Sequence, residues 1–206
     1  MNPIQFYFEF ASPYSYIASL EIDELGRAAG REVEWLPIDI SVVWAAHGVL
    51  DAYAAIRALK RRYIMRDAVR CARVRGVTLA APSASARDAS IAKLAYWGLR
   101  DQDAPLAKRF LRLVWHRYFG EGKPINDLDH LAQASIGLGL DASGIRAAAA
   151  WEGARQAQDV SNADAVDSGC FGIPWFVADG ESFFGHDRLA HLAAHFSKPY
   201  PPTSLD

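Results

Sequence analysis

The stretch Phe6-Tyr7-Phe8-Glu9-Phe10-Ala11-Ser12-Pro13-Tyr14-Ser15-Tyr16-Ile17-Ala18 decides the fold, because it reads as a strand that runs directly into a helix. Apolar residues at positions 4, 6, 8 and 10 alternate with Gln5, Tyr7 and Glu9, which gives the period of a strand over residues 4–10. Ser12 then stands where a helix N-cap is expected, with Pro13 at the first helical position. Apolar residues continue at helical spacing as far as Leu25, so we predict one helix from Pro13. Free N–H groups at a helix start favour an anion, so Ser12 is either a cap alone or a cap beside an anion site.

Three further strands are predicted, one after the first helix and two near the C-terminus, and together with the first strand they form a small sheet. After a stop at Gly30, residues 31–38 read as a second strand, and a strand–helix–strand unit of this length makes its two strands parallel. Asp179-Gly180 is a two-residue hairpin turn between strands predicted at 175–178 and 181–184. Gly185-His186-Asp187 then opens a last helix.

The middle of the chain is helical. Helices are predicted at residues 56–75, 88 or 89 to 99, 106–119, 128–138 and 141–151, the fourth capped by Asn126 or Asp127 and the fifth by Asp141. The order β-α-β, helical block, β-β-α predicts an α/β, thioredoxin-like fold with a large all-helical insertion. We expect a thioredoxin-like domain from residues 1–40 and 158–198, an insertion at 41–157, and an exposed tail at 199–206.

The composition of the chain limits the classes of partner that we expect. The chain has 206 residues, of which 51% are hydrophobic, and a net charge of −2, so a nucleic-acid or membrane partner is not expected. It begins on a strand without a signal peptide or membrane span, so we expect a cytoplasmic protein. Its two cysteines, Cys71 and Cys170, form no CxxC motif and are expected to be small buried residues.

Three segments stand out in order: residues 10–18 (FASPYSYIA), 162–177 (NADAVDSGCFGIPWFV) and 183–189 (FFGHDRL). Together they resemble motifs of the 2-hydroxychromene-2-carboxylate isomerases and the related kappa-class glutathione transferases, which have a DsbA-type fold. Residues 59–67 and Arg70 match the family's helix after the second strand. The isomerases' Asn-Lys/Arg-Pro-Pro stretch is absent from residues 49–53.

The resemblance implies glutathione as the cofactor, with Ser12 facing its sulfur as the catalytic residue. Ser12 would stabilise a thiolate brought in by the ligand, because it offers a hydroxyl and no sulfur of its own. A cis Ile173-Pro174 bond would let the Ile173 backbone pair with glutathione. His186, Asp187 and Lys60 are the other expected cofactor contacts.

The resemblance also implies a substrate pocket containing Tyr14, Arg61 and Trp175, the last bulkier than the small residue often found there. The expected activity is isomerisation of 2-hydroxychromene-2-carboxylate, or of a similar unsaturated aromatic α-keto acid from aromatic-compound catabolism. The glutathione thiolate would add to the double bond, the bond would rotate, and the thiolate would leave. A homodimer is usual for the family.

Other functions remain open. A kappa-like glutathione transferase would release the adduct and consume glutathione, and a non-redox thioredoxin-like binding protein would not bind it. The missing CxxC argues against a DsbA-type oxidoreductase, and a serine hydrolase lacks its G-x-S-x-G motif. His191 and His195 are one turn apart, but we interpret them as a solvated helix face and expect no metal site.

Overall fold

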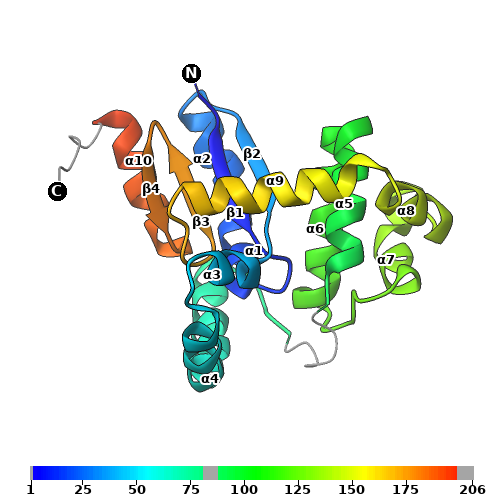
Figure 1. Ribbon diagram of the computed structural model, residues 1–206, viewed down its shortest axis with the longest axis horizontal. Coiled ribbons are helices and arrows are strands. Elements are labelled where there is room, and N and C mark those ends of the chain that lie inside the picture. The colour runs from blue at the N-terminus through cyan, green and yellow to red at the C-terminus, as the bar shows by residue number, and fades with distance from the viewer. Residues whose placement is uncertain (1, 81–87, 199–206) are drawn as a thin grey trace.

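The computed structural model describes residues 2–80 and 88–198. Its four-stranded sheet lies to the left of a block of helices from the middle of the chain (Figure 1). The predicted tail at 199–206 lies outside the described residues. In chain order the elements are β1 (Ile4–Phe8), α1 (Pro13–Ser19), α2 (Ile22–Ala28), β2 (Val33–Pro37), α3 (Ile40–Ala46), α4 (Leu50–Val74), α5 (Ser90–Gln102), α6 (Ala104–Trp115), η2 (His116–Gly120), α7 (Leu128–Ser135), η3 (Ile136–Leu138), α8 (Ala142–Ala149), α9 (Gly153–Asp167), β3 (Trp175–Ala178), β4 (Glu181–Phe184), η4 (His186–Arg188) and α10 (Leu189–Ser197).

The sheet has the strand order β2-β1-β3-β4, with β1 parallel to β2 and the other neighbours antiparallel. The predicted parallel pair and the predicted C-terminal hairpin are therefore both confirmed. Asp179 and Gly180 turn the hairpin with φ of 54° and 84°. Two positive φ values suit the right-handed twist of the flanking strands, which is why an Asp-Gly pair predicts this turn so well.

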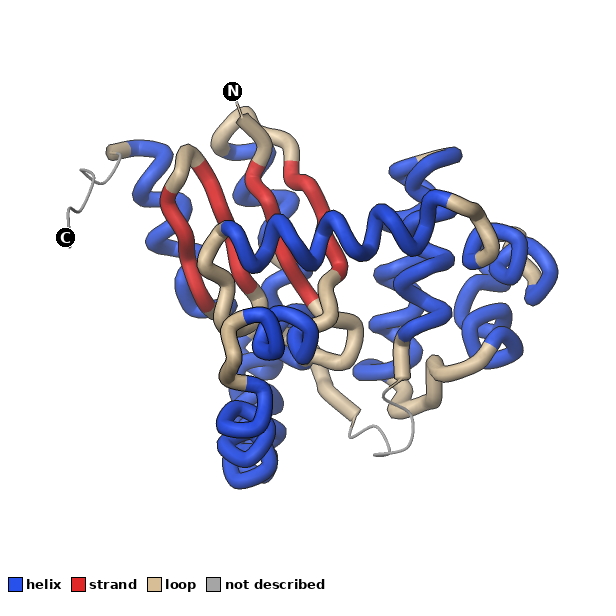
Figure 2. The backbone as a smooth tube through the Cα atoms, viewed as in Figure 1, coloured by secondary structure: helices blue, strands red, loops and turns tan. Residues whose placement is uncertain are grey.

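Helices cover both faces of the sheet. In Figures 1 and 2, α9 crosses the front of the strands, and α2 and α10 lie behind them. Trp35 of β2 donates from its indole nitrogen to Asp23 of α2 at 3.1 Å. At its other end α9 packs against α5, so one helix contacts both the sheet and the helical block. The domain boundary predicted at 157/158 falls within α9.

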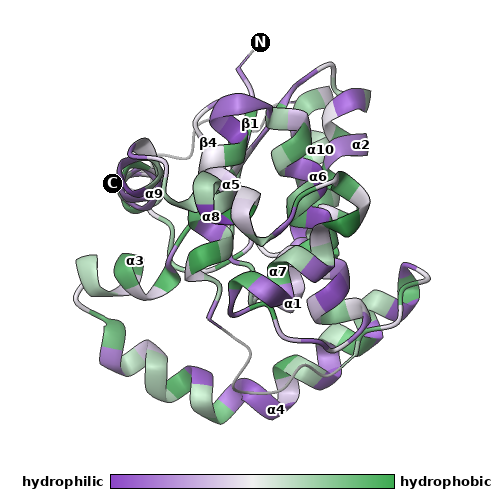
Figure 3. Ribbon diagram, turned by 90° about the vertical axis from the view of Figure 1, so that its right-hand side faces the viewer, coloured by the Kyte–Doolittle hydropathy of each residue, from purple (hydrophilic) through white to green (hydrophobic). Residues whose placement is uncertain are grey.

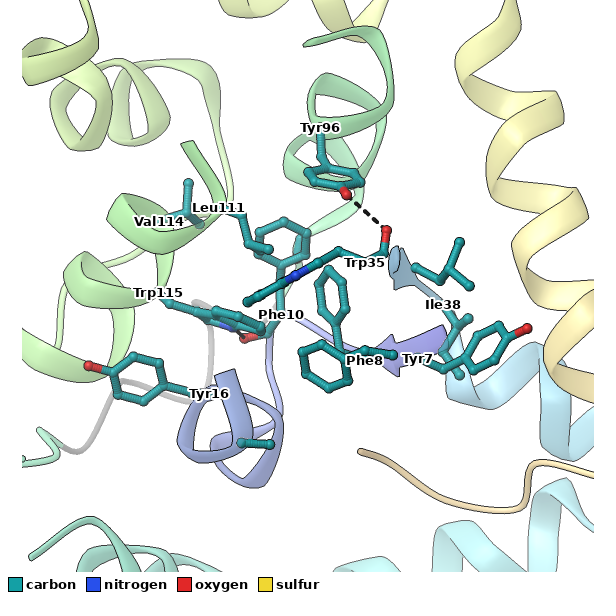
Figure 4. Close-up of a cluster of buried hydrophobic side chains, with 14 of the residues drawn as sticks. Tyr7, Phe8, Phe10, Tyr16, Trp35, Ile38, Tyr96, Leu111, Val114 and Trp115 are labelled. Atoms are coloured by element: carbon teal, nitrogen blue, oxygen red, sulfur yellow. Dashed lines mark hydrogen bonds between the residues drawn. The ribbon is translucent and has the colours of Figure 1, made fainter. Parts of the chain in front are cut away.

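An aromatic core joins the sheet to α5 and α6 (Figure 4). The ring centroid of Phe8 lies 5.1 Å from that of Trp115 and 6.0 Å from that of Trp35. Tyr96 of α5 donates to the carbonyl oxygen of Trp35 at 2.8 Å, the bond dashed in Figure 4. The buried indole of Trp115 donates to the carbonyl oxygen of Phe10 at 2.9 Å. This core fixes the end of the first strand just before Ser12.

The helix after Ser12 is shorter than predicted. It ends at Ser19, and α2 starts at Ile22, so the prediction of one continuous helix is wrong. The amide of Leu20 bonds to the carbonyl of Ile17, which tightens the last turn into a 3₁₀ geometry and points the next residues elsewhere. Leu20, which we assigned to the apolar face, is 41% exposed.

Two further helices differ from the sequence prediction. Helix α4 begins at Leu50, before the predicted start at residue 56, and a positive φ at Gly76 follows its end as expected. Helix α9 was not predicted, because its buried positions are largely polar, Gln158, Ser161 and Asn162 among them. Without an apolar stripe the helical period is invisible in the sequence.

Helix α4 stands away from the rest of the molecule along much of its length (Figure 3). Its apolar side chains include Leu59, which is 83% exposed, and cationic side chains are interspersed among them. Within residues 2–80 and 88–198, no helix combines the length and apolar character needed to cross a membrane.

Candidate active site

Ser12 is the N-cap of α1, as predicted. Its backbone is extended, with φ −94° and ψ 115°, and its Oγ accepts a hydrogen bond from the Ser15 amide at 3.2 Å. In the described part of the chain no group accepts the hydroxyl hydrogen of Ser12, so this hydrogen is available to a ligand. Because α1 has only seven residues, the hydroxyl is a firmer basis for an anion site than the dipole of so short a helix.

Tyr14, in the first turn of α1, connects two other elements to it. Its hydroxyl donates to Oδ2 of Asp67 on α4 at 2.9 Å. Its ring stacks on His186 of η4, with centroids 5.1 Å apart and an interplanar angle of 20°. Burial, assisted by the hydrogen bond to Asp67, raises the pKa of the Tyr14 phenol. Tyr14 is therefore a neutral phenol whose hydrogen points toward α4.

Asp67 was not among the predicted site residues. It also accepts a hydrogen bond from Arg70 at 2.8 Å and a long one from Tyr63 at 3.5 Å. Burial disfavours the charged carboxylate, but the hydrogen bonds from Arg70 and Tyr14 outweigh it and lower the pKa of Asp67. The spacing of Tyr63, Asp67 and Arg70 reveals a cluster on one helix, whereas the contact with Tyr14, 53 residues away, is visible only in the fold.

His186 and Asp187 lie where the chain leaves β4. The His186 side chain is buried, and its Nδ1 has no hydrogen-bond partner among the described residues. Burial, and then the charge of Arg75, lowers the pKa of the imidazole, so His186 is neutral near pH 7. Asp187 is exposed and pairs with Arg188 at 3.2 Å.

The Ile173-Pro174 bond is cis, as the resemblance implied. The carbonyl of Pro174 accepts a hydrogen bond from the amide of Gly185 at 2.9 Å, next to His186. The indole of Trp44 on α3 donates to the carbonyl of Phe171 at 2.9 Å and supports the loop before the proline. The bond between Gly185 and Pro174 therefore joins the second sequence motif to the third.

Lys60 and Arg61 lie on the exposed first half of α4, and neither has an ion-pair partner within the described ranges. Lys60 precedes Asp67 by seven residues, two helical turns, so it shares the face that carries the Tyr14 contact. On another side of α4, Met65, Arg66, Val69, Arg70 and Arg73 line an open groove of about 410 Å³ with Leu79 and Ala80.

Trp175 is only 4% exposed, its indole donates to Ser168 Oγ at 3.1 Å, and it pairs in register with Tyr7. Its place in the pocket wall stays a prediction. One expectation about a side chain is wrong. His195 is buried against Phe183, whereas only His191 is solvent-exposed as expected. The described residues contain no cluster of metal ligands.

Comparison with known proteins identifies the family of the chain. The family model of the DSBA-like thioredoxin domain matches residues 3–197. A 2-hydroxychromene-2-carboxylate isomerase from Sphingobium xenophagum is 32% identical over 93% of this chain and 96% of its own length. The chain belongs to this isomerase family within the DSBA-like proteins.

A solved 2-hydroxychromene-2-carboxylate isomerase superposes with a TM-score of 0.80 at 25% identity, over 95% of this chain and 94% of that one. The chain is also 25% identical to glutathione S-transferase kappa 2 of Caenorhabditis elegans, over 96% of this chain and 92% of that protein. This member of the isomerase family has a serine, not a cysteine, at the start of α1, and its two cysteines are free. The site can therefore donate a hydrogen bond to a thiolate but offers no thiol of its own there.

Proposed function

We propose that the protein is a glutathione-dependent isomerase acting on 2-hydroxychromene-2-carboxylate or a similar unsaturated aromatic α-keto acid of aromatic-compound catabolism. Three curated relatives bear the name of this isomerase, at 27% to 32% identity over more than nine-tenths of the chain. The kappa-class relative has glutathione in its name, which supports glutathione as the cofactor. We further propose that the protein is a homodimer, as the family resemblance implies, and that it is cytoplasmic.

The hydroxyl hydrogen of Ser12, which no group among the described residues accepts, carries this proposal. The hydroxyl already accepts from the Ser15 amide, which fixes the oxygen and leaves its hydrogen for an incoming anion. A hydrogen bond to an ionised group is stronger than one between neutral groups, so the thiolate of bound glutathione would be favoured over the thiol. Ser12 acts here as an activator of the ligand and not as a nucleophile.

The remaining contacts fit a peptide-like ligand with charged ends. The Ile173 backbone lies beside β3, where it can pair with an extended ligand. Among residues 2–80 and 88–198 the buried Nδ1 of His186 has no hydrogen-bond partner, as expected of a group that meets a ligand. Asp187 is available to an ammonium group, and Lys60 to a carboxylate. In this arrangement His186 and Asp187 hold the γ-glutamyl end while Ser12 faces the sulfur.

When bound, glutathione would supply a thiolate nucleophile for reversible addition to the conjugated double bond, with no net redox change. Ser12 lowers the free energy of the thiolate through its hydrogen bond. Lys60, with Arg61 as the neighbouring cation, attracts the substrate carboxylate. Tyr14 stacks on His186 and stays a neutral phenol, because burial raises its pKa.

The test is to add 2-hydroxychromene-2-carboxylate to the protein with glutathione and follow both the isomer ratio and the concentration of free thiol. The proposal predicts that the isomers equilibrate while free thiol stays constant. Stoichiometric loss of thiol would instead establish a kappa-like transferase, the second candidate, which the match to the kappa-class relative favours. Failure to bind millimolar glutathione would contradict both and favour a non-redox binding protein.

A further inference from the structure

Tyr14 is a potential rival of Ser12 as the group that activates the thiol. It lies two residues after Ser12 in the first turn of α1. A phenol donates a hydrogen bond as a serine hydroxyl does, and each has only one hydrogen to donate. Where that one hydrogen goes therefore decides whether Tyr14 can take part in thiol activation.

The hydrogen of Tyr14 is committed to Asp67. The distance from the phenol oxygen to Oδ2 is 2.9 Å, typical of a well-formed hydrogen bond. Arg70 bonds to the other carboxylate oxygen at 2.8 Å and keeps Asp67 charged. A phenol that donates to a carboxylate makes a stronger bond than one that donates to a neutral group, so the hydrogen stays with Asp67.

The ring of Tyr14 is restrained as well. Its stack on His186, at 5.1 Å between centroids, fixes the ring plane against η4. Turning the hydroxyl toward Ser12 would break both the stack and the bond to Asp67. Tyr14 thus ties together three elements that carry the candidate site, namely α1 with Ser12, α4 with Lys60, and η4 with His186.

We propose that Asp67 is a positioning residue that holds the Tyr14 hydroxyl away from the ligand sulfur, so that Tyr14 aligns the site while Ser12 alone activates the thiol. This inference rests on the proposed function. It assigns to Asp67 and Tyr14 an effect on glutathione affinity and to Ser12 an effect on thiolate formation. The two effects are separable by measurement.

The experiment compares Tyr14→Phe, Asp67→Ala, their double variant and Ser12→Ala. Tyr63→Phe is the matched control, because it removes a phenol hydroxyl 3.5 Å from the same carboxylate without touching α1. For each variant, the thiolate absorbance of bound glutathione against pH gives the pKa of the bound thiol, and steady-state rates give KM and kcat. Asp67→Asn is included because it keeps an oxygen that accepts from Tyr14.

The proposal predicts that Tyr14→Phe and Asp67→Ala each raise KM for glutathione about tenfold, and that Tyr14→Phe leaves the bound-thiol pKa at its wild-type value. The double variant should be no worse than either single one, because both remove the same bond. Asp67→Asn should recover much of the affinity, and Tyr63→Phe should resemble the wild type. Ser12→Ala alone should raise the bound-thiol pKa.

A rise in the bound-thiol pKa of Tyr14→Phe would overturn the proposal by making Tyr14 an activator. Wild-type kinetics in Asp67→Ala, or additive losses in the double variant, would also overturn it. In both of these cases a wild-type enzyme that binds glutathione and isomerises its substrate leaves the proposed function intact. If the wild type binds no glutathione, the proposed function fails and the positioning role fails with it.

Discussion

Replacing Ser12 by alanine or by aspartate separates the two roles that its side chain has in the structure. Alanine removes both the oxygen that accepts from the Ser15 amide and the hydrogen that is free for a ligand. Aspartate keeps an oxygen for the cap but has no hydrogen to donate, and it sets a negative charge against the thiolate. We therefore expect Ser12→Ala to lose stability and activity, and Ser12→Asp to lose activity only.

The magnitudes follow from the two bonds. Loss of a helix N-cap costs about 1 kcal/mol, which for a chain of this length lowers Tm by about 2–4 °C. A hydrogen bond to an ionised group contributes about 1.5–3 kcal/mol, so losing it should lower kcat/KM by about 10-fold to 150-fold. For Ser12→Asp the fall in rate should be at least as large, with Tm close to the wild-type value.

The assay is urea unfolding together with kcat/KM for the isomerisation. Asp103→Ala is the matched control, because Asp103 caps α6 by accepting from the Leu106 amide at 2.9 Å, outside the candidate site. It should lose a similar free energy of unfolding and keep its activity. An active Ser12→Asp variant, or a Ser12→Ala variant no less active than Asp103→Ala, would refute the reasoning.

Three further outcomes are expected. Gly98→Ala should lower the free energy of unfolding in urea by about 3 kcal/mol, because its Cβ would clash with the carbonyl oxygen of Ala148. Gly137→Ala is the control and should be nearly neutral, because a Cβ there would meet no atom within 4 Å beyond its chain neighbours. Burial lowers the pKa of His186 from its ordinary 6.5, so the unfolded state binds more protons than the folded state. The Tm of the wild type should therefore fall as the pH drops through about 6.5. In His186→Phe this part of the pH dependence of Tm should disappear. Trp175→Phe should cost about 2 kcal/mol in urea unfolding because the indole hydrogen bond to Ser168 is lost, and it should change KM for the aromatic substrate as the predicted pocket wall requires; an unchanged KM would place this residue in the core alone.

Local signals in the sequence account for much of the fold. The Asp179-Gly180 turn was predictable because its backbone conformation suits few other residue pairs. Ser12 was predictable as a cap because the bond it makes reaches only three residues along the chain. The turn and the cap each depend only on residues close in sequence, so both can be predicted without the tertiary fold.

Features that depend on distant residues could not be predicted in this way. Helix α9 buries polar residues such as Gln158, whose amide bonds to the carbonyl of Pro37, so its buried face carries no apolar period. The role of Asp67 depends on Tyr14, which only the packing of α4 on α1 brings within reach.

The central claim is that Ser12 lowers the pKa of the thiol of bound glutathione, and the ultraviolet absorbance of the thiolate tests it directly. The wild-type protein would be titrated with glutathione at several pH values, with Ser12→Ala measured in parallel. The account predicts that glutathione bound to the wild type forms thiolate at a lower pH than glutathione free in the same buffer, and that Ser12→Ala abolishes most of this difference. Bound glutathione that ionises at the same pH as the free molecule would contradict the account.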